Sequence, residues 1–131
     1  MTKKVKVELS EIYGSKYDID GKLRIYGTLG YQTTNGSPVT LWATTSDNCL
    51  VLGDHAYSHW LGVSNEIELM EGEAIRIGGF LLEHDIVLAP SDMGVRWRQV
   101  TYNDIPCIEN EIRFDEHEGL EAKLTFSVTE I

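Results

Sequence analysis

The sequence predicts an all-β fold, an antiparallel two-sheet β-sandwich of about eight strands. Three observations support this prediction. Apolar and polar residues alternate along several segments, which is the periodicity of a half-buried strand. Turn-forming residues recur between these segments at intervals of about 8–14 residues. No segment has a convincing helical period, and the best helix candidate, residues 55–61, is short and rich in aromatic residues.

Four segments carry most of the strand signal. In residues 5–12 every second residue is apolar until the end, where a bulge or turn shifts the phase. Residues 23–29 repeat this pattern, and residues 74–82 begin in the same way before becoming apolar on both faces. Residues 120–128 alternate throughout, so their even-numbered side chains are expected to face the core. Five shorter segments complete the predicted strands: 39–43, 49–52, 66–69, 95–100 and 111–114.

Turn signals separate the predicted strands. They are Asp20-Gly21, residues 35–38, residues 46–48, Glu71-Gly72 and Glu118-Gly119. No repeat, low-complexity tract or linker interrupts the chain. A chain of this length buries about two thirds of its unfolded surface in one core. We therefore expect residues 1–131 to form a single β-sandwich domain.

The charge balance narrows the classes of partner. The chain has 21 acidic residues against 11 lysines and arginines, a formal net charge of −10. This field repels phosphate backbones, so nucleic acid is not an expected partner. It suits divalent cations or a protein partner with a basic surface, although solubility alone would also explain it.

Targeting and cysteine signals are sparse. Residues 1–6 are charged but precede no apolar run, so the sequence in this form predicts neither a signal peptide nor a spanning helix. We therefore expect a cytoplasmic location, and export by another route stays open. Cys49 and Cys107 lack the spacing of a zinc or dithiol site. We expect two separate buried thiols, with one disulfide as the alternative in an exported protein.

Two loops carry closely spaced acids, residues 17–22 and residues 83–94. Calcium prefers six to eight hard oxygen ligands, and carboxylates two residues apart across a turn converge easily. If both loops lie at one end of the sandwich, a calcium site is predicted from Asp18, Asp20, Glu83, Asp85 and Asp92, with Asp47 and Asp54 nearby. An EF-hand is excluded, because Lys16 and Gly27 would occupy its first and twelfth positions.

The arrangement resembles the C-two domain, the calcium- and phospholipid-binding β-sandwich family. Glu83-His84-Asp85 stands where that family has Asp-x-Asp, and Asp92-Met93-Gly94 where it has its closing Asp and Gly. Asp18 and Asp20 correspond to the family's first acidic loop. The sequence departs from the pattern in its leading Glu83 and in a longer gap between Asp85 and Asp92. The resemblance implies a non-enzymatic, calcium-responsive binding module that engages a protein or membrane-surface partner.

The second loop also contains an apolar run, and Ile86, Val87 and Leu88 form a candidate interaction tip. If exposed, it would insert into a bilayer interface or a partner's groove; if paired, it would be a core strand. The net charge opposes an anionic membrane unless calcium bridges the two surfaces.

Other chemistries have weaker signals. His55 and His59 lack the further ligands that zinc needs, and no nucleophile elbow or phosphate loop is present, so no enzyme is predicted. A metal-independent subunit or inhibitor that recruits a basic partner stays open. A carbohydrate-binding module also stays open because aromatic residues such as Tyr57 and Trp60 supply rigid contact area. Alternation around Trp97 predicts that its ring packs in the core, with a basic stripe outside.

Overall fold

The computed structural model describes residues 1–53, 57–85 and 89–131. Nine strands and two short 3-10 turns, η1 and η2, are present in this described part of the chain. The strands are β1 Thr2–Lys16, β2 Lys22–Thr33, β3 Val39–Thr44, β4 Leu50–Gly53, β5 Ser58–Met70, β6 Ala74–Glu83, β7 Ser91–Thr101, β8 Cys107–Phe114 and β9 Glu121–Glu130. The two turns are η1 Ser46–Asn48 and η2 Tyr102–Asp104.

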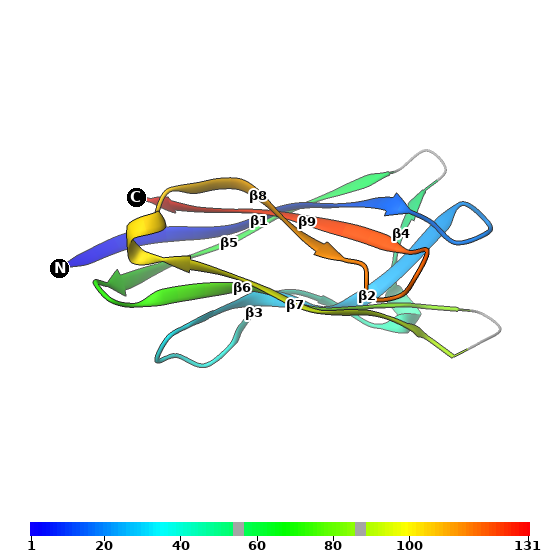
Figure 1. Cartoon of the computed structure of the whole chain (residues 1–131), viewed down its shortest axis with the longest axis horizontal. Coiled ribbons are helices and arrows are strands. Elements are labelled where there is room, and N and C mark those ends of the chain that lie inside the picture. Colours follow the sequence, from blue (N-terminus) through cyan, green and yellow to red (C-terminus); the bar gives the residue numbers. More distant parts are fainter. Residues whose placement is uncertain (54–56, 86–88) are drawn as a thin grey trace.

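The strands form two antiparallel sheets that stack as layers (Figure 1). One sheet has the order β5-β1-β9-β8. The other has the order β3-β2-β6-β7, with β4 also pairing with β2. The predicted antiparallel sandwich is therefore confirmed, and each of the nine strands in the described residues overlaps one of the segments that the sequence predicts.

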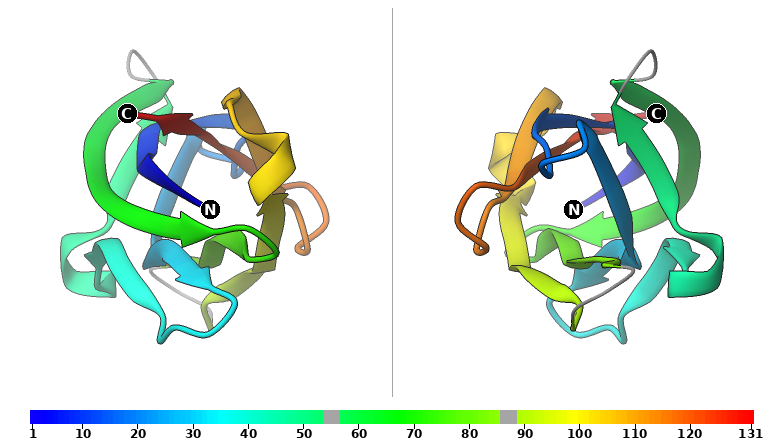
Figure 2. Two further views of the ribbon diagram at one scale, coloured as in Figure 1. Left: turned by 90° about the vertical axis from the view of Figure 1, so that its left-hand side faces the viewer. Right: turned by 90° about the vertical axis from the view of Figure 1, so that its right-hand side faces the viewer.

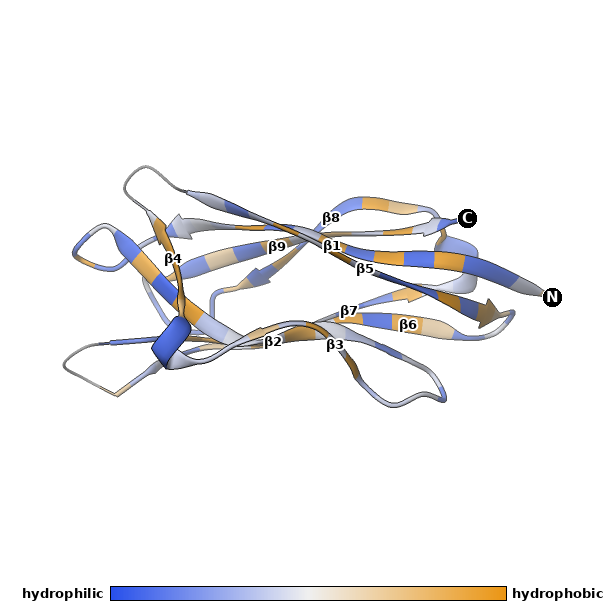
Figure 3. Ribbon diagram, turned by 180° about the vertical axis from the view of Figure 1, so that it is seen from behind, coloured by the Kyte–Doolittle hydropathy of each residue, from blue (hydrophilic) through white to orange (hydrophobic). Residues whose placement is uncertain are grey.

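The core lies between the layers and follows the alternation of the sequence. On β9 the side chains of Ala122, Leu124, Phe126 and Val128 are fully buried, as the even-position pattern predicts. Figure 3 shows the resulting apolar and polar stripes along β1 and β2. The phase shift expected near residue 12 is a β-bulge between Leu9 and Glu11, where the register of β1 against both neighbours slips.

Two details of the sequence interpretation change. The weak helix candidate at residues 55–61 has Ser58–Leu61 in strand β5, and residues 54–56 lie outside the described part of the chain. The prediction for Trp97 is wrong. Its ring is 37% exposed on the outer face of β7, where the Arg76 guanidinium carbon lies 4.3 Å from the ring centroid.

The reason is the position of β7 at the end of its sheet. Arg96 reaches the β8–β9 connection, where its Nη2 lies 2.8 Å from a Glu116 carboxylate oxygen. Arg98 Nη1 donates to the Glu111 backbone carbonyl at 3.4 Å. The side chains of β7 still alternate between two faces. The face that turns toward the other sheet carries Arg96 and Arg98 and is therefore polar, which leaves Trp97 on the outer face.

Cys49 and Cys107 are both free and half-buried, so they do not form a disulfide. Among the described residues, no helical segment has the length and apolar content to cross a membrane.

Candidate functional site

The strand register brings the two acidic loops to one end of the sandwich. β2 begins at Lys22 and β6 ends at Glu83, and the two strands are antiparallel neighbours with Ile25 opposite Glu83. Glu83 is also opposite Ser91, the first residue of β7. The β1–β2 loop therefore lies near the end of β6 and the start of β7, at the end of the sandwich opposite the chain termini (Figure 1; Figure 2, right).

An acidic recess of about 690 Å³ opens at this end. Four predicted site residues line it: Asp18, Glu83, Asp85 and Asp92. The β8–β9 connection contributes another wall. We call this surface the acidic recess.

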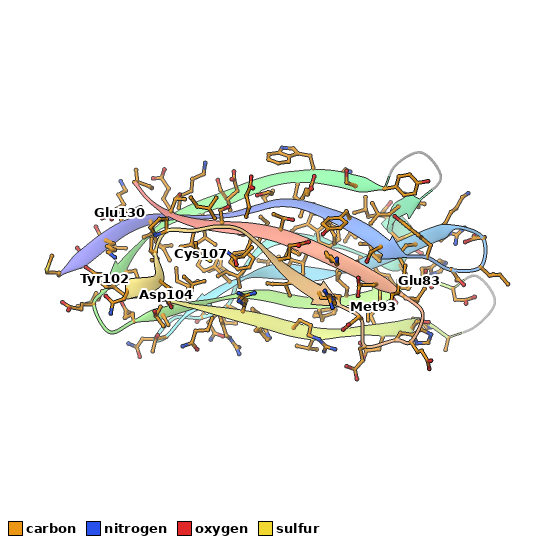
Figure 4. All side chains as sticks on the ribbon, turned by 45° about the horizontal axis from the view of Figure 1, so that its top comes forward. Glu83, Met93, Tyr102, Asp104, Cys107 and Glu130 are labelled. Atoms are coloured by element: carbon orange, nitrogen blue, oxygen red, sulfur yellow. The ribbon has the colours of Figure 1, made fainter. Side chains whose placement is uncertain are left out.

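Glu83 is the unusual residue of the recess. It is 1% exposed, and its Oε2 has no hydrogen-bond partner within the described part of the chain. Burial, followed by the negative charge of Asp18, raises the pKa of Glu83 from 4.5 to about 7, although a hydrogen bond from the Arg24 backbone opposes the rise. A buried carboxyl with one unsatisfied oxygen is costly, so it either holds a proton or needs a cation. Figure 4 shows Glu83 at the loop end of the sandwich.

Asp18 shares a side-chain hydrogen bond with Glu83, so the two loops are in direct contact. The loop conformation fixes Asp18, because its Oδ1 accepts a hydrogen bond from the Ile19 backbone N–H at 2.7 Å. Its own N–H donates to the Lys22 carbonyl at 3.0 Å. Two carboxyl groups that share one hydrogen bond repel each other when both are ionised.

Asp20 does not join the recess, in contrast to the sequence prediction. The Arg24 Nη2 donates to its Oδ2 at 2.7 Å, and its Oδ1 accepts from the Lys22 N–H at 3.0 Å. The hydrogen bond from Arg24 lowers the pKa of Asp20. Asp18 lines the recess, whereas the nearby Arg24 holds the Asp20 carboxylate.

Asp85 and Asp92 approach from the β6–β7 side of the recess. Asp85 is half-buried, while Asp92 is exposed and its Oδ1 accepts from the Gly94 N–H at 2.9 Å. Within the described residues, no three histidine, cysteine, aspartate or glutamate side chains are grouped closely enough to hold a metal ion. Four of the five predicted ligands therefore line one recess, and Asp20 does not. The four carboxyl groups are not close enough to form a preformed metal site.

Several other predictions concern this end of the molecule. The candidate tip Ile86, Val87 and Leu88 lies outside the described residues, as do Asp54 and His55. Asp47 lies in the turn η1 and is not part of the recess lining. His59 is an exposed residue of strand β5.

Sequence reasoning missed the third wall of the recess. His117 and Glu118 line it from the β8–β9 connection, which is tied to β7 because the Glu116 N–H donates to the Met93 carbonyl at 3.0 Å. The Glu118-Gly119 turn signal was visible in the sequence. The position of this turn beside Glu83 and Asp92 was not visible, because it depends on how the two sheets pack.

Among known proteins, solved structures match this architecture. No protein-family model matches the chain, and no curated protein matches it either. Among solved structures, a C2 domain of plant extended synaptotagmin 1 superposes with a TM-score of 0.52 at 9% identity, over 98% of this chain and 93% of that one. The chain has a C2-like fold.

Two larger proteins match through part of their length. A structure with the two C2 domains of extended synaptotagmin 2 gives a TM-score of 0.51 at 13% identity, over 98% of this chain and 40% of that one. The human GIVD cytosolic phospholipase A2, solved with methyl gamma-linolenyl fluorophosphonate, gives 0.50 at 10% identity, over 99% of this chain and 17% of that one. At such identities the likeness concerns the fold.

Proposed function

We propose that residues 1–131 act as a non-enzymatic binding module whose loop end engages a membrane or protein surface when calcium occupies the acidic recess. The observation that carries the proposal is Glu83, whose buried Oε2 lacks a partner within the described residues beside a second carboxylate, Asp18. The C2-like fold is consistent with such a module.

The residues of the recess fit a hard divalent cation in their chemistry. Carboxylate oxygens are the ligands that calcium prefers, and a cation between Asp18 and Glu83 would remove both the repulsion and the unsatisfied oxygen. Asp85 and Asp92 would complete the set from the other wall. Because no three of these groups are already close together among the described residues, binding must draw the loops inward. That ordering cost predicts weaker binding than a preformed cage would give.

Calcium would supply positive charge at an end of the molecule that otherwise repels anionic surfaces. The net charge of −10 opposes contact with anionic lipid, and a bound divalent ion offsets it locally. The chain's own contribution is to hold Asp18 by its loop hydrogen bonds and to exclude water from Glu83.

Thermal melting with added calcium tests the proposal. A ligand that binds only the folded state raises its stability by about 1.4 kcal/mol at tenfold excess over Kd. For a domain of this size that corresponds to a rise in Tm of roughly 3–6 °C. Magnesium and sodium chloride at matched ionic strength control for screening of the acidic surface. An equal rise in all three salts would count against a specific site.

Two variants in one loop supply a matched control. Asp18→Asn is expected to remove most of the calcium-dependent rise in Tm, while Asp20→Asn keeps it because the Asp20 carboxylate faces Arg24. Both changes remove one negative charge from the same loop. If Asp20→Asn abolishes the rise and Asp18→Asn does not, the ligand set is wrong. Where the expected pattern holds, sedimentation with phosphatidylserine vesicles then separates a membrane partner from a protein partner.

A metal-independent module is the second candidate function. The specific observation in its favour is that the carboxylates of the described residues do not already form a three-ligand group. Absence of any calcium effect on Tm at millimolar concentrations would select it.

A further inference from the structure

A second surface lies on the outer face of the β5-β1-β9-β8 sheet, which turns toward the viewer in Figure 4. It is a groove of about 900 Å³. One row of paired residues crosses all four strands of the sheet: Trp60 of β5, Glu11 of β1, Thr125 of β9 and Glu111 of β8. We call this surface the sheet groove.

Two bulges shape the sheet groove. The bulge of β1 turns both Ser10 and Glu11 toward the lining. The register slip of β8 between Cys107 and Asn110 inserts a residue that lifts Ile108 and Glu109 above the sheet as a wall. Glu109 has a φ of 51°, which residues other than glycine rarely adopt, and its N–H donates to the Ser127 hydroxyl at 3.0 Å. Backbone outliers of this kind concentrate at functional surfaces.

Exposed aromatic rings form the opposite wall. Trp60 is 66% exposed and Tyr57 is 58% exposed. The Trp60 ring lies against Gly62, since a Cβ added there would fall 2.5 Å from the indole Nε1. Tyr57 is braced by Tyr17, with ring centroids 5.8 Å apart and planes at 65°. Residues of this chain therefore hold both rings in place before any partner binds.

The charge of the groove is unbalanced. Its lining has four glutamates against one lysine, a balance of three negative charges. Lys6 is committed to Glu8 at 3.7 Å, and Glu111 accepts a hydrogen bond from the Tyr13 hydroxyl. Within the described part of the chain, the carboxylates of Glu11 and Glu109 have neither an ion pair nor a side-chain hydrogen bond. Covering these carboxylates with a neutral ligand would desolvate them without compensation.

We propose that the sheet groove binds an extended, basic segment of a partner protein, with arginine or lysine side chains placed between the aromatic wall and the carboxylates of Glu11 and Glu109. Guanidinium and ammonium groups pair with carboxylates and also pack on indole and phenol faces, so both walls select the same ligand chemistry. The lining of β1 extends from Lys6 to Tyr13, which matches an extended peptide of about eight residues.

Fluorescence anisotropy of a labelled oligoarginine peptide of about eight residues tests the proposal, with EDTA present so that the acidic recess holds no calcium. We expect the double variant Glu11→Gln with Glu109→Gln to weaken binding about tenfold, as expected for the loss of charge-assisted contacts. The matched control, Glu71→Gln with Asp47→Asn, removes two exposed charges elsewhere and is expected to change the affinity by less than about twofold at physiological salt.

Trp60→Ala is expected to weaken binding about fivefold, because the cation–π contact is lost. Trp97→Ala, which removes an exposed indole from the other sheet, is its control and should leave the affinity unchanged.

Three outcomes would overturn the proposal. Equal weakening by both double variants would mean that only the overall charge attracts the peptide. Loss of binding in Asp18→Asn with Asp92→Asn, but not in the groove variants, would place the peptide in the acidic recess. Trp60-dependent binding of a neutral oligosaccharide, without oligoarginine binding, would make the groove a carbohydrate site.

Discussion

The acidic recess and the sheet groove both carry carboxylates, but they treat those charges in opposite ways. In the recess, Glu83 is 1% exposed and lies next to Asp18, so burial itself makes the charged form costly. In the groove, Glu11 and Glu109 stand on a solvent-facing sheet surface. The difference teaches that acidic side chains in one β-sandwich can have two roles. A buried carboxyl beside a second one requires a proton or a cation, whereas carboxylates on an open surface attract a basic partner.

The two surfaces also differ in what builds them. The recess depends on residues from three connections between strands. Two of them meet because β2, β6 and β7 are adjacent, and the third, between β8 and β9, comes from the other sheet. The groove depends on strand register and on two bulges within one sheet. They adjoin at the contact between Tyr17, which lines the recess, and Tyr57, which lines the groove.

The largest expected effect concerns the buried carboxyl. The pKa of Glu83 is raised from 4.5 to about 7 in the folded protein. The stability lost by ionising Glu83 in the folded state is therefore zero below pH 4.5 and reaches its full value above pH 7. Glu83→Gln is therefore expected to exceed the wild type in unfolding free energy by on the order of 2–3 kcal/mol at pH 8, and to match it near pH 4.5. Urea unfolding of both proteins across this range measures the difference. A constant difference at all pH values would contradict a buried, titrating Glu83.

A smaller effect is expected from its neighbour. Asp18→Asn removes the second-largest cause of the raised pKa of Glu83, so burial, opposed by the contacts with Arg24, is the main cause that stays. The variant should therefore show a lower midpoint for the titration of Glu83, and a stability at pH 8 above the wild type by about 1 kcal/mol. NMR titration of the Glu83 carboxyl carbon gives the midpoint directly. An unchanged midpoint would mean that the two carboxyl groups are not coupled.

The smallest effect is expected from the groove. Glu11→Gln with Glu109→Gln should change the unfolding free energy by less than about 0.5 kcal/mol, because solvent-facing charges without partners contribute little. The change should also be the same at pH 6 and pH 8. A loss of several kcal/mol would show that these carboxylates support the fold, and the contrast between the two surfaces would fail.

Much of the architecture could be predicted from the sequence, because strand periodicity is a local property. The even-numbered residues of β9 from Ala122 to Val128 are buried as predicted, and the phase shift near Ile12 is a bulge. The prediction for Trp97 failed for a specific reason. Alternation assigns side chains to two faces but does not say which face is apolar, and at β7 the inward face borders an open, polar edge.

The candidate site could be predicted only in part. The sequence located the acids, and a C2-like resemblance suggested which loops would meet. It did not reveal that Arg24 holds Asp20 away from the recess, or that the β8–β9 connection completes it. The calcium ligands themselves stay a prediction.

The sequence by itself determined that this chain forms alternating strands, that two of its loops concentrate acids, and that its net charge is strongly negative. These properties follow from side-chain chemistry and the two-residue period of a strand. Only the tertiary structure decided which acids are buried and which are exposed to solvent. Burial depends on the neighbours that a distant strand supplies, and it is burial that separates Glu83 from Asp20, Glu11 and Glu109.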